Sequence, residues 1–271
     1  MKIGIFDSGY GGLTILSKIR GALPMYDYIY LGDNARTPYG TRSFEIIYEY
    51  TLEAVRFLQA QGCRLIILAC NTASAKALRS IQMHNIDPNT IRVLGVIRPT
   101  VEAVRSITRN GHVGILATPG TVKSESYVIE LQKQFGEQNA VISQQECPMW
   151  VPLIEAGEAA NEGADYFVDK YIHSLLDQDP EIDTIILGCT HYPLLMQKIQ
   201  RALDGTNIQV VAQGDIVAAS LQDYLNRHTE IQTQLSMGGT CTFLTTEAES
   251  KFSNSASVFL DCPVNAIHVN I

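Results

Sequence analysis

The chain has 271 residues, of which 46% are hydrophobic and 18% are charged, and its formal net charge is −8 at pH 7. This composition is typical of a globular protein with a large core and excludes a disordered chain. The acidic balance and the lack of a long apolar run argue against nucleic acid or a membrane as the main partner. With six cysteines and no signal-peptide pattern at its start, the sequence predicts a cytoplasmic protein with reduced thiols.

Short apolar runs alternate with longer amphipathic segments along the chain. The runs are rich in Ile, Val and Leu, as is typical of strands buried on both faces of a parallel sheet, and they lie at 2–6, 28–31, 64–69, 92–96, 112–117, 184–188 and 209–212. Helical spacing of apolar residues occurs at 12–22, 44–58, 73–83, 99–109, 121–135, 163–177, 193–203 and 215–226. The stretch 240–271 predicts short strands and turns with one brief helix. The alternation predicts an α/β fold with mostly parallel sheets.

Two pairs of segments resemble each other. The segment 65–72 is similar to 184–191, because each has an apolar strand, a small residue, a cysteine and then polar residues. The segment 3–9 is similar to 113–119 in the same way, in the same order and at a similar offset. Buried strands often look alike, but two ordered pairs predict two related α/β halves.

Two cysteines, Cys70 and Cys189, directly follow the strands of the first pair of similar segments. Ligands bind at the carboxyl ends of strands in open parallel sheets. The residues after each cysteine can begin a helix, whose free N–H groups would hold a carboxylate and lower the pKa of the thiol. One such cysteine is more often a small buried residue, whereas two at equivalent positions favour a function. The remaining cysteines are predicted to be structural: Cys63, Cys147, Cys241 and Cys262.

Two thiols that face each other across a ligand can invert a stereocentre. One, as thiolate, removes a proton from carbon, and the other, as thiol, delivers a proton to the opposite face. Asp7 and His191, one in each half, could shuttle or tune these protons, although each could equally be a polar residue satisfied in a turn.

Other polar motifs give weaker indications. The segment 9–12, Gly-Tyr-Gly-Gly, lacks the spacing of a phosphate-binding loop and predicts a tight turn with close backbone approach. In the loop 31–40, Tyr39 could contact a ligand or simply pack. The spacing of Cys189 and His191 is too close for a tetrahedral zinc site, so we expect no metal. A Cys–His nucleophile is possible but would leave Cys70 without a role.

Taken together, these residues resemble glutamate racemase, the cofactor-independent family that supplies D-glutamate for peptidoglycan. The motifs are Asp-Ser-Gly-x-Gly-Gly at 7–12, Gly-Asp-x-x-Arg-x-Pro-Tyr-Gly at 32–40, Cys-Asn-Thr-Ala at 70–73 and Gly-Cys-Thr-His-Tyr-Pro-Leu at 188–194. The resemblance spans the chain and favours the glutamate branch over aspartate and hydantoin racemases. It implies an isomerase that needs no pyridoxal phosphate or other cofactor.

The resemblance also implies residue roles. Cys70 and Cys189 would be the two proton donors and acceptors, with Cys189 acting on the L-enantiomer and Cys70 on the D-enantiomer. Asp7, His191 and Glu155 would assist catalysis, with Glu155 orienting His191. Substrate would be bound by Asp7, Ser8, Pro38, Tyr39, Gly40, Asn71, Thr72, Thr118, Thr121, Thr190 and His191.

The family resemblance implies two α/β domains with the active site in the cleft between them. Residues 1–97 plus 208–271 would form the first domain, and 98–207 the second. Glutamate would be the small-molecule partner, and a homodimer is possible. The chain departs from the family pattern at 211–215, Val-Ala-Gln-Gly-Asp, and at Arg98 before Pro99, which puts the hinge in question.

Three alternatives remain open from the sequence. A racemase for another amino acid, such as aspartate, would differ only in the pocket that holds the side chain. An amino-acid-binding protein without catalysis would share the two-half architecture. A thiol hydrolase would form a covalent adduct on one cysteine.

Overall fold

The computed structural model describes residues 1–136, 140–260 and 262–271, which form two parallel β-sheets. The first sheet has the strand order β10-β9-β2-β1-β3-β4, with β1 Ile3–Asp7, β2 Tyr28–Gly32, β3 Leu65–Leu68, β4 Arg92–Gly95, β9 Cys241–Thr245 and β10 Ala266–His268. The second has the order β6-β5-β7-β8, with β5 His112–Ala117, β6 Val141–Glu146, β7 Thr184–Gly188 and β8 Gln209–Val211. Every pairing is parallel, so the predicted fold class is confirmed.

The sheets repeat one topology. The order β2-β1-β3-β4 of the first sheet corresponds to β6-β5-β7-β8 of the second, so β1 is equivalent to β5 and β3 to β7. These are the strands of the two segment pairs that resemble each other in sequence. The predicted relation between the halves is therefore confirmed, and the first sheet is extended by β9 and β10 at its β2 edge.

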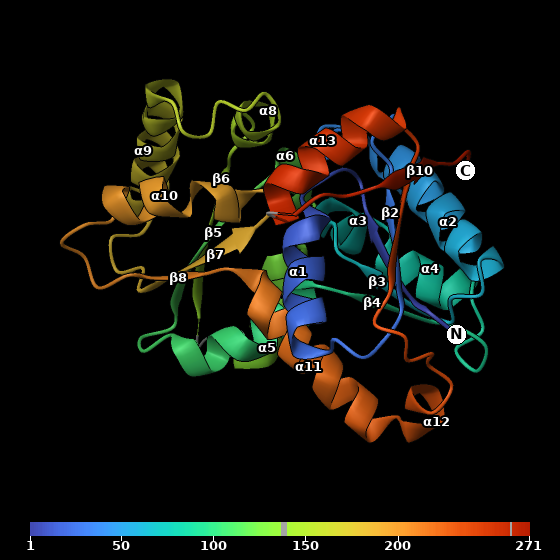
Figure 1. Ribbon diagram of the computed structural model, residues 1–271. Coiled ribbons are helices and arrows are strands. Elements are labelled where there is room, and N and C mark those ends of the chain that lie inside the picture. The colour runs from blue at the N-terminus through green and yellow to red at the C-terminus, as the bar shows by residue number, and fades with distance from the viewer. Residues whose placement is uncertain (137–139, 261) are drawn as a thin grey trace.

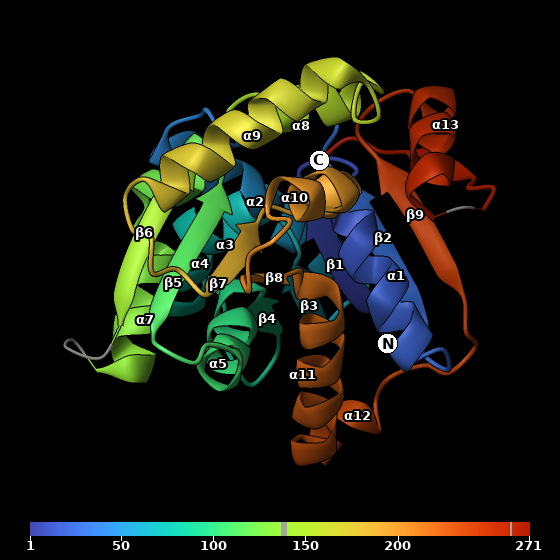
Figure 2. The ribbon, with the colours of Figure 1, turned by 90° about the vertical axis from the view of Figure 1, so that its left-hand side faces the viewer.

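Helices cover both faces of each sheet (Figure 1). Around the first sheet lie α1 Gly12–Ala22, α2 Phe44–Ala60, α3 Asn71–Lys76, α4 Leu78–His84, α11 Gln213–Arg227, α12 Thr229–Gln232 and α13 Glu249–Leu260. Around the second lie α5 Ile97–Ile107, α6 Pro119–Lys123, α7 Ser126–Phe135, α8 Trp150–Glu155, α9 Glu162–Leu176, the 3₁₀ helix η1 Tyr192–Leu195 and α10 Met196–Ala202. Figure 2 shows α9 lying across β5 and β6, which it contacts. None of the helices in these ranges is long and apolar enough to cross a membrane.

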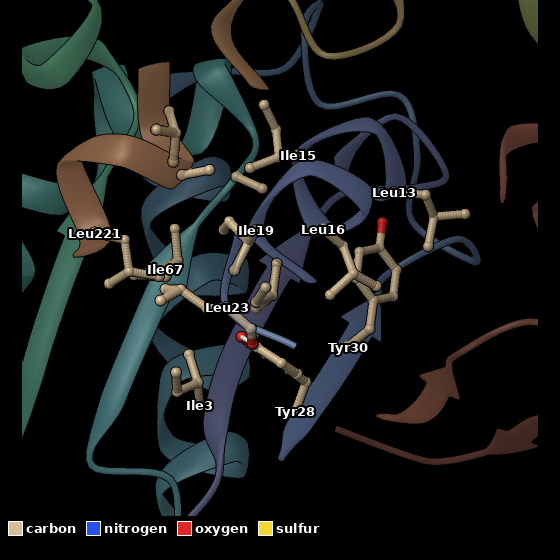
Figure 3. Close-up of a cluster of buried hydrophobic side chains, with 14 of the residues drawn as sticks. Ile3, Leu13, Ile15, Leu16, Ile19, Leu23, Tyr28, Tyr30, Ile67 and Leu221 are labelled. Atoms are coloured by element: carbon tan, nitrogen blue, oxygen red, sulfur yellow. Dashed lines mark hydrogen bonds between the residues drawn. The ribbon is translucent and has the colours of Figure 1, made fainter. Parts of the chain in front are cut away.

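Alternate side chains of the strands enter different cores, because successive residues of a strand point to opposite faces. Ile3 and Ile5 of β1 pack with α1 and α11, whereas Phe6 packs with α2 on the other face. Figure 3 shows the first of these cores, with Ile19 of α1 and Leu221 of α11 next to Ile67 of β3. Burial on both faces explains why the strands are uniformly apolar in sequence.

All seven predicted strands are present, but several predicted helices are divided. The segment 73–83 forms α3 and α4, and 121–135 forms α6 and α7, where Glu125 has a left-handed φ of 53°. The segment 193–203 forms η1 and α10. The predicted strands and helix of 240–271 are confirmed, although residue 261 in this segment lies outside the described residues.

Candidate active site

The carboxyl ends of equivalent strands from both sheets meet at a cavity of about 70 Å³. Strand β3 leads into Cys70 and its counterpart β7 leads into Cys189, and both cysteines line the cavity. Strands β1 and β5 lead to Ser8 and Thr118. The full lining is Ser8, Thr37, Pro38, Tyr39, Gly40, Thr41, Cys70, Asn71, Thr72, Thr118, Pro119, Cys147, Pro148, Val151, Pro152, Cys189, Thr190 and His191.

Cys70 is the residue immediately before α3 and is only 6% exposed. The Ser8 hydroxyl lies 3.4 Å from its sulfur. Burial, together with the nearby charge of Asp7, raises the pKa of the Cys70 thiol to about 12, although the Ser8 hydroxyl opposes this shift. The sequence-based prediction of a lowered pKa is therefore wrong for Cys70, because desolvation outweighs the helix start.

Cys189 begins a chain of polar groups in the second half. Its sulfur lies 3.9 Å from Nδ1 of His191, and Nε2 of His191 lies 3.1 Å from Oε1 of Glu155. Burial alone would lower the pKa of His191, but the hydrogen bonds to Cys189 and Glu155 outweigh it and raise that pKa to about 10. An imidazolium next to a sulfur stabilises negative charge on that sulfur.

Asp7 lies behind the cavity rather than in its wall. It is completely buried, and its Oδ2 accepts a hydrogen bond of 2.9 Å from the N–H of Gly9. The Thr190 hydroxyl donates to Oδ1 at 3.4 Å, so Asp7 joins the two halves. Burial raises the pKa of Asp7, although the positive charge of His191 opposes this shift.

The glycines before α1 allow this close approach. A Cβ added to Gly11 would lie 2.3 Å from Oγ1 of Thr190 and 2.4 Å from Nδ1 of His191. A Cβ on Gly12 would lie 2.5 Å from Cβ of Asp7. The prediction that 9–12 serves close backbone approach is confirmed.

The loop before α2 contributes backbone and ring surface to the cavity. Tyr39 and its neighbours Pro38 and Gly40 line the cavity, but the Tyr39 hydroxyl donates to Oδ2 of the buried Asp33. The carbonyl oxygen of Gly40 accepts a 2.7 Å hydrogen bond from the N–H of Gly120. Tyr39 therefore lines the cavity, and its hydroxyl holds the loop to Asp33.

Three threonine hydroxyls meet where the two halves touch. Oγ1 of Thr72 lies 3.0 Å from Oγ1 of Thr118 and 3.4 Å from Oγ1 of Thr121. Thr72 and Thr118 line the cavity, whereas Thr121 lies behind Thr118, 3.1 Å away. Thr118 also begins α6 by accepting from the N–H of Thr121.

Asn71 lines the cavity, but its side chain is held elsewhere. Its amide nitrogen donates to Gln213 and its amide oxygen accepts from the Tyr127 hydroxyl, each at 2.6 Å. The backbone N–H of Asn71, in the first turn of α3, has no partner within the helix and can face a ligand.

The structure brings most of the predicted site residues to the cavity wall, and leaves Asp7, Glu155 and Thr121 one layer behind it. Cys147 is also in the wall, although the sequence predicted only a structural role for it. It follows β6, a half-buried edge strand of sequence Val-Ile-Ser-Gln-Gln-Glu that has no long apolar run. The rule that located Cys70 and Cys189 would have located Cys147 had this strand been recognised.

The arrangement supplies two protonatable sulfurs from opposite halves around one small space. Two such sulfurs suit proton transfer at a carbon atom. The cavity is far smaller than the 300–1,000 Å³ usual for larger ligands, so it suits a small molecule. In the ranges that the structure describes, no group of three or more His, Cys, Asp or Glu side chains could hold a metal ion.

Comparison with known proteins agrees with this geometry. The model of the Asp/Glu/Hydantoin racemase family matches residues 14–221. The glutamate racemase of Paracoccus denitrificans is 41% identical over 275 residues, which covers 97% of this chain and 98% of that protein. A glutamate racemase isoform from Bacillus anthracis has a structure that superposes with a TM-score of 0.90 at 32% identity, covering 100% of this chain and 97% of that one.

A second solved structure is that of the Francisella tularensis glutamate racemase in complex with D-glutamate. It superposes with a TM-score of 0.85 at 31% identity, covering 100% of this chain and 96% of that one. The chain belongs to the Asp/Glu/Hydantoin racemase family and, within it, to the glutamate racemases, which are isomerases that act on amino acids.

Proposed function

We propose that this chain interconverts L- and D-glutamate by proton transfer between two cysteines and the substrate Cα, without a cofactor. The observation that carries the proposal is the placement of Cys70 and Cys189, from equivalent strand ends of the two halves, in the wall of one small cavity. Similarity to glutamate racemases over nearly the whole chain supports glutamate as the substrate.

The surroundings of the two thiols suggest their starting states. The protonated His191 stabilises Cys189 as the thiolate that removes the Cα proton. Cys70, whose pKa is raised by burial, starts as the thiol that delivers a proton to the opposite face. After one turnover the sulfurs have exchanged states, and the reverse reaction follows the same path. Backbone N–H groups after each cysteine would stabilise the charge that develops on the substrate carboxylate.

Glu155 and Asp7 have supporting roles in this proposal. Glu155 holds His191 by its Nε2 and keeps Nδ1 directed at Cys189. Asp7 orients the start of the Cys189 loop through Thr190, and the Ser8 hydroxyl holds the sulfur of Cys70. The wall residues Pro38, Tyr39, Gly40, Asn71, Thr72, Thr118 and Thr190 would enclose the substrate, with Thr121 supporting Thr118.

We also propose a two-domain organisation, with the domain boundaries at the crossings between the sheets. The first crossing lies between β4 and α5, next to the proposed boundary at 97–98, which falls at the start of α5. The second lies between β8 and α11, because β8 pairs with β7 in the second sheet although it lies after the expected boundary at 207–208. The proposal thus moves that boundary to residues 211–213.

The proposed biological role is the supply of D-glutamate for peptidoglycan in the cytoplasm, by an enzyme that forms a homodimer. These points rest on the family resemblance. Light scattering on the purified protein tests the dimer, and loss of growth on depletion, restored by added D-glutamate, tests the role.

The first experiment places the purified protein with L-glutamate in heavy water, without added cofactor, and follows D-glutamate and deuterium at Cα. We expect both to appear together. Exchange with aspartate but not glutamate would move the substrate assignment, and exchange of no amino acid would favour a binding protein.

The second experiment replaces each thiol separately. Cys70→Ser and Cys189→Ser should each lower racemisation by several orders of magnitude, because a hydroxyl is a far weaker acid than a thiol. Cys63→Ser is the matched control, since this buried cysteine is outside the cavity wall. Undiminished turnover in either variant would exclude the two-thiol mechanism.

A further inference from the structure

Three buried side chains behind the cavity form a closed ring of hydrogen bonds. The Tyr127 hydroxyl donates to Oδ1 of Asn71 at 2.6 Å, and Nδ2 of Asn71 donates to Oε1 of Gln213 at 2.6 Å. Nε2 of Gln213 then donates to the Tyr127 hydroxyl at 2.8 Å and closes the ring. Each of the three residues is at most 2% exposed.

The ring joins three separate parts of the fold. Asn71 is the first residue of α3 and follows Cys70 directly. Tyr127 is on α7, beside the second sheet, and Gln213 is the first residue of α11, at one of the two chain crossings. Gln213 also donates to Oγ1 of Thr100 at 2.9 Å, and Thr100 belongs to α5 at the other crossing.

Tyr127 extends the ring to the second thiol. A Cβ added to Gly188, the residue before Cys189, would lie 3.3 Å from the aromatic ring of Tyr127. This aromatic ring therefore packs against the backbone of Gly188. The hydroxyl of the same side chain is bonded to the residue that follows Cys70. The Tyr127 side chain thus contacts the residue before Cys189 with its aromatic ring and the residue after Cys70 with its hydroxyl.

The bonding of the ring fixes the orientation of each side chain. Burial raises the pKa of Tyr127, so its hydroxyl keeps its proton near neutral pH and can act as a donor. Both ends of the Asn71 amide and both ends of the Gln213 amide are bonded, which leaves neither free to rotate. Hydrogen bonds in such a buried ring strengthen one another, and an unpaired member would be costly.

We propose that Gln213 is a positioning residue, which sets the separation of Cys70 and Cys189 by holding Asn71 and Tyr127. This inference rests on the proposed two-thiol racemisation. The residue touches neither substrate nor sulfur and acts through the ring.

The chemistry makes this separation important. One sulfur takes the Cα proton as its S–H bond forms and the Cα–H bond breaks, and the other sulfur gives its proton to the opposite face. Both sulfurs must therefore be within reach of the same carbon, and a misplacement of about 1 Å can cost about 100-fold in rate. A change in the ring should slow turnover more than it weakens substrate binding.

Gln213→Glu gives the sharpest test, because a protonated carboxyl can keep the bond to Tyr127, although its single proton cannot also serve Thr100, and a carboxylate can donate to neither. We expect racemisation near the wild-type rate at low pH. Relative to wild type at the same pH, it should fall about tenfold or more as the pH rises through the pKa of the new carboxyl. Unfolding caused by the buried carboxylate would also depend on pH, so the folded fraction is followed by circular dichroism at each pH and the rate is expressed per folded molecule. A rate per folded molecule that stays a constant fraction of the wild-type rate would contradict the positioning role.

Tyr127→Phe removes the hydroxyl that donates to Asn71 and accepts from Gln213, and so opens the ring of hydrogen bonds at a second residue. It should lower kcat about tenfold and change KM by less than about threefold, while its ring still packs on Gly188. Tyr28→Phe is the matched control, because the Tyr28 hydroxyl is equally buried and donates to the Leu23 carbonyl oxygen at 2.7 Å, far from the cavity. The control should keep wild-type kcat and lose a similar amount of stability.

The outcomes separate the two proposals. Wild-type enzyme that does not racemise glutamate would overturn the proposed function, whatever the variants do. Active wild-type enzyme with a Tyr127→Phe variant of unchanged kcat, or with a pH-independent ratio for Gln213→Glu, would overturn the role of Gln213. If one variant fails to fold in circular dichroism, the other decides.

Discussion

Equivalent positions in the two halves place the two cysteines in unlike electrostatic surroundings. Cys70 has a hydroxyl partner and a buried carboxyl group nearby, whereas Cys189 has an imidazole held by a carboxylate. The topology is repeated, but the side chains around each sulfur are not. The difference between the thiols therefore arises at the scale of single residues.

The raised pKa of His191 predicts a pH dependence of stability. Folding raises this pKa from 6.5 to about 10, so the protonated form stabilises the fold. The contribution is fully present below pH 6.5, declines as the pH rises above it, and is lost as the pH passes 10. His191→Asn should remove this decline. Urea unfolding of both proteins at pH 6, 8 and 10 measures it.

The difference between the two free energies of unfolding isolates the histidine from other titrating groups. His173 provides a control, because it is an exposed histidine whose Nδ1 lies 2.7 Å from the carbonyl oxygen of Asp169. His173→Asn tests the loss of an imidazole at a position outside the cavity wall. A constant difference between wild type and His191→Asn would mean that folding does not change the pKa of His191.

The sequence motifs predict which residues line the cavity better than they predict which of their atoms face it. Tyr39 and Asn71 were placed at the site from their motifs, and both line the cavity. Their polar atoms face away, because Asp33 takes the hydroxyl of Tyr39 and Gln213 takes the amide of Asn71. Gln213 lies 142 residues from Asn71 in the chain, so no local pattern could show that bond.

At the scale of elements, helix α1 begins where the two halves press together. Gly11 has φ −56° and ψ −37°, a backbone that any residue adopts, so only space requires a glycine there. In Gly11→Ala, the new methyl group would displace Thr190 and the ring of His191, both of which are buried. We expect at least about a tenfold loss of kcat and about 1–3 kcal/mol of destabilisation, measured by turnover and urea unfolding.

Gly21 in the same helix is the matched control. A Cβ there would meet no atom within 4 Å. Gly21→Ala should raise the free energy of unfolding by up to about 1 kcal/mol, since alanine favours the helix, and leave turnover unchanged. If the Gly11→Ala enzyme keeps the wild-type kcat, Thr190 and His191 can shift to accommodate the methyl group without loss of activity.

The strands buried on both faces were all predicted, whereas β6, a half-buried edge strand rich in polar residues, was missed. Strands β1, β3, β5 and β7 are buried on both faces, and each was visible as an apolar run. Strand β6 forms the edge of its sheet and is only half-buried, so polar residues are tolerated there. The helical period continued through 73–83, but the chain bends at Ala77, whose φ of −115° departs from helical geometry.

At the scale of the whole molecule, the sequence pairs predicted the equivalence of the halves but not how they meet. Helix α1 packs on α11, and α11 packs on α5, so elements from distant parts of the chain lie side by side (Figures 1 and 2). The halves also meet through single hydrogen bonds from loops and helix starts, such as the one between Thr72 and Thr118. Such bonds leave no periodic pattern in a sequence.

The contact of Gly120 with Gly40, a residue of the cavity wall, joins the two halves and yields a prediction about how they meet. The N–H of Gly120 lies in the first turn of α6, where it lacks a helical partner, and it donates to the Gly40 carbonyl oxygen. A Cβ on Gly120 would lie 2.8 Å from that oxygen and 3.2 Å from Nζ of Lys76. Gly120→Ala should therefore force the halves apart and admit water, which weakens every electrostatic contact in the site.

We expect Gly120→Ala to raise KM and to lower kcat/KM by about tenfold or more, with little change in the melting temperature, because each half keeps its own core. Gly163→Ala is the control, since Gly163 lies on α9 beside the same sheet and a Cβ there would meet nothing within 4 Å. Wild-type KM in Gly120→Ala would mean that catalysis does not require this closed contact. A loss confined to Gly120→Ala would identify it as the point at which the two halves enclose the substrate.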